Sequence, residues 1–131
     1  MKKGFTLIEL LVSIAIIALI LSVAIISISN TNAKKRDAIR IANMNEIFKA
    51  LSLYQNEIQK YPIYTGNITG SDLMSTTLQN ADTISKVPTD PLDSYNYIYT
   101  SANGTDFTLG FCLETNTIKG YSQGCGNTIS P

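Results

Sequence analysis

An apolar run near the N-terminus is the feature that most restricts how this chain can fold. Residues 10–28 are apolar except for three serines, Glu9 stands at the head of the run, and the next charge is Lys34. As an α-helix the run would be about 29 Å long, close to the ~30 Å hydrocarbon core of a bilayer. A lone carboxylate is costly in hydrocarbon. The sequence therefore predicts a membrane-spanning helix whose edge carries an acid that needs a partner.

Two common kinds of N-terminal segment fit the apolar run only in part. A cleavable secretory signal has a basic start, an apolar stretch and small residues at the cut, and residues 27–29 (Ser-Ile-Ser) offer small side chains. The apolar stretch of such a signal is usually about 7–15 residues long, which is shorter than this run. An ordinary single-span anchor is the second alternative. Neither alternative gives Glu9 a role.

The absence of helix breakers predicts that the helix continues far beyond the apolar run. No Gly or Pro occurs from Phe5 to Tyr61, and Pro62 then ends the helix. Residues 27–32 are its weakest stretch by intrinsic propensity. The second half carries an apolar stripe that we expect to pack on the head: Met44, Ile47, Leu51, Tyr54 and Ile58. On its wetter side we expect acid–base pairs: Asp37/Arg40, Glu46/Lys49 and Glu57/Lys60.

Residues 62–131 have the pattern of a small antiparallel β head. Two alternating segments, 95–100 and 105–113, flank the turn signal at residues 103–104 (Asn-Gly), and 117–121 is a weaker third strand. The residues expected on one face of the second segment are Phe107, Leu109, Phe111 and Leu113. A three-stranded sheet of this size needs a covering helix, which the amphipathic half of the long helix supplies.

A second, short helix is predicted before the strands. Ser71 is expected to cap a helix over residues 72–79, because Ser is a favoured N-cap residue. The residues expected on its inner face are Leu73, Thr77 and Leu78.

The composition argues against several classes of function. The chain has no His, and no phosphate-binding loop, catalytic triad or metal cluster can be assembled from it, so we expect no enzyme activity, cofactor or metal. The head carries two lysines against six acidic residues, a net charge of −4. This is not the basic footprint of a nucleic-acid binder. Asp90 lies in the turn-rich phrase VPTDP, and we expect it to serve a turn rather than to act as an acid catalyst.

The chain has two cysteines and two sequons. Cys112 and Cys125 indicate a disulfide if the head is exported, whereas in a cytosolic protein the pair would be ordinary thiols. Asn67 and Asn103 each begin an Asn-x-Thr triplet, a pattern that is common by chance. The second triplet is also explained as a turn.

The nonapeptide GFTLIELLV at residues 4–12 gives Glu9 a role, because it resembles the class III signal of type IV pilins and of type II secretion pseudopilins. The resemblance includes the short basic leader, Gly4 at the cut, and Phe5 next. It implies that a prepilin peptidase cuts between Gly4 and Phe5 on the cytoplasmic side and methylates the new amino group of Phe5. The implied parts are a leader at 1–4, a transmembrane and filament-core helix at 5–29, an amphipathic half-helix at 30–61 and the β head at 62–131.

Cleavage would give Glu9 a cationic partner. On a helix Phe5 and Glu9 lie four residues apart on one face, so Glu9 can pair with its own new amine. The assembly pattern of the family instead pairs Glu9 with the Phe5 amine of a neighbouring subunit. Either pairing reduces the cost of a carboxylate in a dry environment. A third alternative leaves Glu9 solvated at headgroup depth.

The resemblance implies a pilin-like α+β fold, in which the second half of the long helix packs on a small three-stranded antiparallel sheet. It also implies a non-enzymatic subunit of a type IV pilus-like filament, with a cytoplasmic N-terminus and the head outside the cytoplasm. The implied partners are further copies in a homo-oligomeric filament, minor pilins, a prepilin peptidase, an inner-membrane platform protein and an assembly ATPase. No nucleic-acid partner is expected.

Other functions remain open from the sequence. The Tyr61-Pro62 junction and VPTDP at residues 87–91 are similar to major pseudopilins, which favours a pseudopilin of type II secretion or DNA uptake. The phrase GYSQGCGN at residues 120–127 lacks the acids of their calcium loop, which favours a small pilin without calcium. A single-pass membrane-anchored binding domain is an alternative from another class, and it predicts no cleavage after Gly4.

Overall fold

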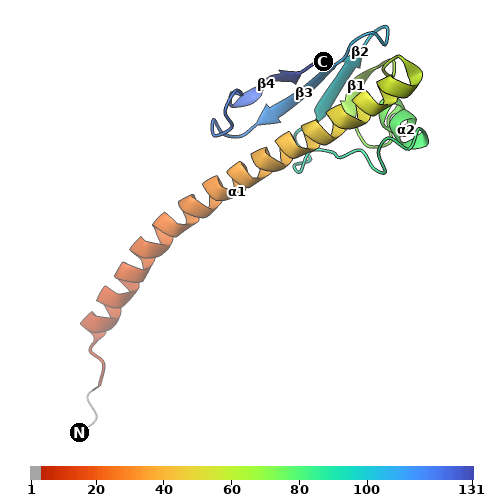
Figure 1. Ribbon diagram of the computed structural model, residues 1–131. Helices are drawn as coiled ribbons and strands as arrows, with labels where there is room; N and C mark the ends of the chain where they lie inside the picture. The colour runs from red at the N-terminus through yellow and green to blue at the C-terminus, as the bar shows by residue number, and fades with distance from the viewer. Residues whose placement is uncertain (1–3) are drawn as a thin grey trace. The chain divides into compact units, whose positions relative to one another are not determined.

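The computed structural model of the protein describes residues 4–131, apart from the side chains of residues 24–27. The chain divides into two compact units, one that ends at Ala33 and one over Lys34–Pro131. Helix α1 (Leu7–Ile58) contributes to both units, and the second unit adds a four-stranded sheet and helix α2 (Leu73–Asn80) (Figure 1). These elements confirm the predicted α+β, pilin-like architecture.

Helix α1 is shorter than the predicted helix at both ends. It begins at Leu7, where Thr6 supplies the first accepting carbonyl, to the Leu10 N–H at 3.2 Å. It ends at Ile58, and Gln59 then adopts a left-handed φ of 61°. Pro62 lies just beyond this left-handed residue, which is a common way for a helix to end. The predicted stop at Pro62 is therefore correct to within a few residues.

The sheet is antiparallel throughout, with strand order β1-β2-β3-β4. Its strands are β1 (Tyr64–Ile68), β2 (Tyr97–Ser101), β3 (Thr108–Leu113) and β4 (Gly124–Ile129). Each strand pairs with the next strand along the chain, so β2 and β3 are central and β1 and β4 are the edges. In the second unit, α1 lies along one face of this sheet (Figure 1).

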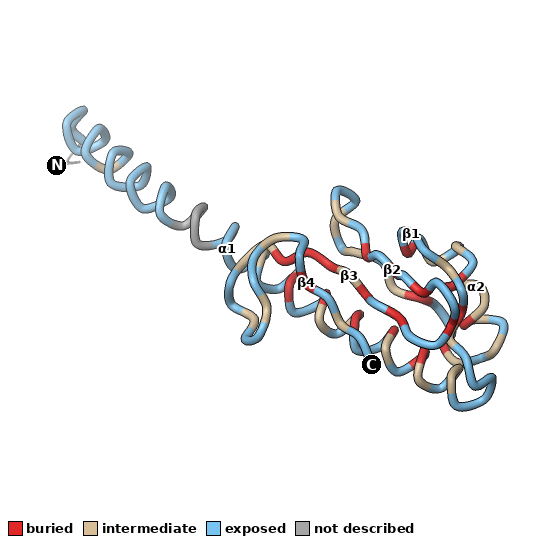
Figure 2. The backbone as a smooth tube through the Cα atoms, turned by 90° about the horizontal axis from the view of Figure 1, so that it is seen from above, coloured by how far each residue is buried: buried red, intermediate tan, exposed pale blue. Residues whose placement is uncertain are grey.

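The core of the second unit lies between α1 and the sheet. Met44, Ile47 and Leu51 of the predicted stripe are fully buried, whereas Ile58 at its end is 54% exposed. The sheet contributes alternate residues, and buried stretches follow its central strands (Figure 2). The buried side chains of this face are Tyr97, Tyr99, Phe107, Leu109, Phe111 and Leu113. The inward face predicted for residues 105–113 is thus confirmed, although the strand begins only at Thr108 and Cys112 is buried as well.

The sheet differs from the prediction in having four strands instead of three. The predicted strand at 117–121 is a loop, in which the Tyr121 N–H donates to the Ile118 carbonyl at 3.3 Å. Strand β4 forms next to β3 instead, and β1 had not been predicted. Both unexpected strands contain Gly and Asn, which have low strand propensity. Their pairing with a neighbouring strand, rather than their own sequence, places them in the sheet.

Helix α2 confirms the predicted short helix but turns a different face inward. Its N-cap is Asp72 rather than Ser71, and the Asp72 carboxylate accepts from the Ser75 N–H at 2.9 Å. The buried residues are Met74, Ser75 and Leu78, so Leu78 alone was predicted correctly, and Leu73 is 61% exposed. A carboxylate caps a helix as well as a hydroxyl does, and the sequence offered both next to each other.

The loop between β2 and β3 holds the end of α1 in place. The Tyr61 N–H donates to the Gly104 carbonyl at 2.8 Å, and Gly104 has a φ of 76°. A Cβ atom on Gly104 would lie 2.8 Å from the Tyr61 carbonyl oxygen. Glycine is therefore required at this turn, both for its left-handed backbone and for the close approach of the helix end.

Candidate functional site

The residues at the start of α1 form a reciprocal hydrogen-bonded cap. The Glu9 N–H donates to Thr6 Oγ1 at 3.3 Å, while the Thr6 N–H donates to Glu9 Oε2 at 2.9 Å. The Thr6 hydroxyl also donates to Glu9 Oε2, at 2.7 Å. This arrangement is a capping box, which satisfies backbone N–H groups that a helix start otherwise leaves unpaired. Glu9 therefore has a role within its own chain, which is separate from the predicted pairing.

The capping box was readable from the sequence but was missed. Thr followed three residues later by Glu, before an apolar run, is its signature, and residues 6–9 read Thr-Leu-Ile-Glu. Because the cap uses main-chain and side-chain atoms of Thr6, it does not depend on a bond before Phe5. Cleavage after Gly4 would leave every one of its hydrogen bonds intact.

The geometry of Phe5 and Glu9 leaves their predicted pairing possible. Phe5 precedes the first helical residue, so the two residues do not form a helical i, i+4 pair as predicted. Both nevertheless line one open recess, together with Ile8, Val12 and Ser13. Within residues 4–131, all hydrogen bonds to the Glu9 carboxylate use Oε2, so Oε1 has no partner there. With respect to residues 4–131, one carboxylate oxygen therefore remains open to a cation.

In the first unit, nearly all described side chains of the apolar run are exposed. Leu7, Leu19 and Val23 are each at least 70% exposed. Hydroxyl groups inside the run bond to the helix itself, with Ser13 Oγ donating to the Glu9 carbonyl and Ser22 Oγ to the Leu19 carbonyl, both at 2.7 Å. Among the described residues, α1 is both long enough and apolar enough to cross a membrane. These features fit a membrane anchor.

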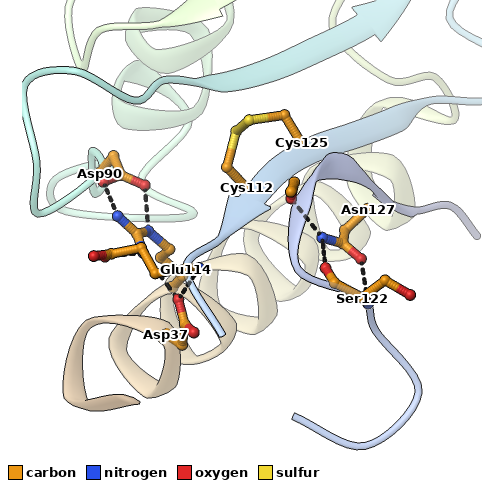
Figure 3. The surroundings of a disulfide bond; sticks show 9 residues. Asp37, Asp90, Cys112, Glu114, Ser122, Cys125 and Asn127 are labelled. Carbon is orange, nitrogen blue, oxygen red and sulfur yellow. Dashed lines mark hydrogen bonds and ion pairs between the residues drawn. A yellow bond between two sulfur atoms is a disulfide. The ribbon is translucent and has the colours of Figure 1, made fainter. Parts of the chain in front are cut away.

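A buried ion cluster lies in the second unit where α1 meets two loops. Asp37 and Arg40 are fully buried, which contradicts their predicted place on the wetter side of the helix. Arg40 makes a two-bond contact with Asp90, at 2.7 and 2.8 Å, and also donates to Asp37 at 2.9 Å and to Glu114 at 2.6 Å. Arg36 completes the cluster by a second contact with Glu114. Figure 3 shows the three acids of the cluster, Asp37, Asp90 and Glu114, close to one another.

The ion cluster fixes both loops to α1. Asp37 accepts from the Glu114 and Thr115 N–H groups at 2.9 and 2.8 Å, which binds the turn after β3. Asp90 accepts from the Leu92 N–H at 2.9 Å, so the predicted turn role is present, but it also has the cationic partner that sequence reasoning did not find. Two of the three partners of Arg40, Asp90 and Glu114, lie 50 and 74 residues away in sequence. Spacing along the chain carries no signal of such a contact.

Hydrogen bonds and burial shift the pKa values of several residues in the cluster. Hydrogen bonds from Arg36 and Arg40 lower the pKa of Glu114 to about 2, despite the opposing effect of burial. The pKa of Asp37 is also lowered, because the hydrogen bonds that it accepts from residues 114 and 115 outweigh burial. Burial opposes the charge of Arg40, but bonds to Asp90 and Glu114 raise its pKa. Glu114, Asp37 and Arg40 are thus ionised at neutral pH.

The structure forms the predicted disulfide between Cys112 and Cys125. It links β3 to β4 close to a turn that the Asn127 side chain closes, with the Asn127 amide donating to the Ser122 and Gly124 carbonyls (Figure 3). Within residues 4–131, no group of His, Cys, Asp or Glu side chains could hold a metal ion.

Comparison with known proteins identifies the N-terminal segment. Residues 1–28 match the family model described as the prokaryotic N-terminal methylation motif. This motif is the class III prepilin signal of type IV pilins and pseudopilins. No curated protein and no solved structure gives a significant match. The chain thus carries the signal of a pilin-type prepilin, and the predicted resemblance is confirmed for this segment.

Proposed function

We propose that the protein is a structural subunit of a type IV pilus-like filament, made as a prepilin, cleaved after Gly4 and N-methylated at Phe5. The observation that carries the proposal is the methylation motif over residues 1–28, set directly before an exposed apolar helix. An apolar helix with exposed side chains suits transfer from lipid into a bundle of like helices, because both environments are apolar. The head would then form the filament surface.

In this proposed function, the two carboxylate oxygens of Glu9 have separate roles. Oε2 holds the Thr6 cap, which orders the first turn of the helix. Oε1 is open to the methylated amine of Phe5, from the same chain or from a neighbour in the filament. A charge pair in an apolar bundle is stabilising only when both partners are present. Glu9 therefore favours docking of processed subunits over unprocessed ones.

The proposed partners follow from this function. They are further copies of the chain and minor pilins, a prepilin peptidase, an inner-membrane platform protein and an assembly ATPase. The N-terminus lies on the cytoplasmic side, and the head lies outside the cytoplasm. A pseudopilin of type II secretion or DNA uptake is the second candidate, because the Tyr61-Pro62 junction and residues 87–91 are similar to major pseudopilins.

Substitution of Glu9 tests the proposal in cells that carry the assembly machinery. Glu9→Gln keeps the size of the side chain and one accepting oxygen but removes the charge. We expect normal membrane insertion and loss of filaments from the sheared cell fraction. Glu46→Gln, an exposed acid of the same helix, is the matched control and should assemble normally. Normal filaments from the Glu9→Gln chain would overturn the role of charge pairing.

A further inference from the structure

The face of the sheet that points away from α1 carries an ordered array of neutral side chains. Strand register places Thr65, Thr100 and Thr108 side by side in one row. The neighbouring row joins residues from all four strands: Asn67, Ile98, Gly110 and Thr128. All of these residues are exposed except Gly110, which is half-buried. The alternation of the strands thus assembles hydroxyl and amide groups on one surface.

The array has no ionisable side chain, although the head as a whole has a net charge of −4. The acidic residues of the head lie in loops, in turns and at the start of α2, and the two nearest along these strands are Glu114, directly after β3, and Asp106, two residues before it. A surface without charge gives no electrostatic attraction to nucleic acid, anionic lipid or a charged protein patch. The chemistry of the array therefore suits a neutral partner.

The centre of the array is apolar and shallow. Ile98 is 48% exposed, and its neighbour Gly110 has no side chain to cover it. A Cβ atom on Gly110 would lie 3.5 Å from the Ile98 Cβ, which is ordinary contact, so packing does not require a glycine there. An apolar centre ringed by hydroxyl groups matches a sugar ring, which has a C–H face and polar edges.

The size of the array favours a small ligand over a protein. With strands about 4.8 Å apart and alternate residues about 6.8 Å apart, the two rows cover roughly 200–300 Å². A stable protein interface buries about 800 Å² on each partner. The array is therefore too small to hold a second copy of the chain by itself, but it can accommodate a short stretch of sugar rings.

We propose that this outer face of the sheet binds an uncharged polysaccharide. Thr65, Thr100, Thr108, Thr128 and Asn67 bond to sugar hydroxyls, and Ile98 contacts the C–H face of a ring. One head binds weakly, because the contact is small and partly wet. The gain from many heads in a row rests on the proposed filament function. Binding by a single head does not depend on it.

The test uses the full chain in phosphatidylcholine nanodiscs, which avoids detergents with sugar headgroups. A glycan array that carries neutral and anionic oligosaccharides gives the ligand class. Titration with the best neutral oligosaccharide, followed through Thr and Ile methyl signals, then locates the contact. We expect binding to neutral glycans and shifts at the four array threonines and Ile98, while Thr83 and Thr89, outside the array, stay unchanged.

Two variants probe the array without disturbing the core. Thr100→Lys adds a charge to the centre of the threonine row, and Gly110→Gln covers Ile98. Each should weaken binding about tenfold or more, whereas Ser94→Lys, an exposed position outside the strands, should not change it. Several outcomes would overturn the inference: no binding, binding to anionic glycans alone, equal binding by all variants, or methyl shifts that follow protein concentration rather than added sugar. Monomeric binding without filaments would refute only the proposed function.

Discussion

Replacing Arg40 by Met removes the guanidinium that holds three acids of the ion cluster, while keeping most of the side-chain volume. The three acids differ in how many hydrogen bonds they keep after this substitution. Asp37 retains its bonds from the Glu114 N–H and from the N–H and hydroxyl of Thr115, and Glu114 retains Arg36. Asp90, which is 1% exposed as a side chain, retains only the Leu92 N–H among its described partners. The cost therefore falls mainly on Asp90.

The structure sets the size of this effect. Breaking a buried ion pair by removing one partner costs about 3–5 kcal/mol, because the other charge stays buried without compensation. We expect Arg40→Met to lower the free energy of unfolding of the head by this amount, a large part of the 5–15 kcal/mol typical of a domain. Loss of the contact between the Arg40 guanidinium and the Tyr95 ring, at 5.0 Å, acts in the same direction.

A second substitution isolates the charge on Asp90. In the Arg40→Met background, Asp90→Asn should recover about 2 kcal/mol, because an imperfectly bonded amide costs about 1–3 kcal/mol, less than a buried charge. Urea unfolding of the full chain in nanodiscs, followed by near-UV circular dichroism of its 7 tyrosines, measures both changes. Lys49→Met, an exposed cation on the same helix, is the control and should change stability by less than about 0.5 kcal/mol. A loss below 1 kcal/mol for Arg40→Met, or no recovery by Asp90→Asn, would refute the reasoning.

Three further changes test the head. Acidification from pH 4.5 to 2 should destabilise it progressively, because the pKa of Glu114 is about 2 when folded and 4.5 when unfolded, and Glu114→Gln should flatten this slope in pH-dependent urea unfolding. Replacing both cysteines by Ser should cost roughly 3 kcal/mol in the same assay, whereas an unchanged midpoint would argue against the disulfide as a stabiliser. Gly104→Ala should cost more than Gly120→Ala, since both have positive φ but Gly104 alone faces a carbonyl oxygen, and equal losses would contradict that contact.

The long helix, the central strands and the disulfide could be predicted because their signals are local. The absence of Gly and Pro from residues 5–61 predicted the long helix, and alternating apolar and polar residues predicted β3. The motif at residues 4–12 indicated the resemblance to pilins. Strand β4 could not be predicted, because Gly124 and Gly126 give its sequence a low strand propensity. It forms through its pairing with β3. The ion cluster could not be predicted either, because it depends on contacts between residues that are distant in sequence. Asp37 and Arg40 read as an ordinary surface pair, and their burial depends on Asp90 and Glu114, which are distant in sequence.

The central claim, processing of a prepilin, is tested most directly by mass spectrometry of the full chain extracted from membranes of cells that make it. The account predicts a mature chain that begins with N-methylated Phe5 and retains the whole apolar helix. An intact chain that begins at Met1 would contradict it. A chain that begins at Asn30, as left by a secretory signal peptidase, would contradict it equally.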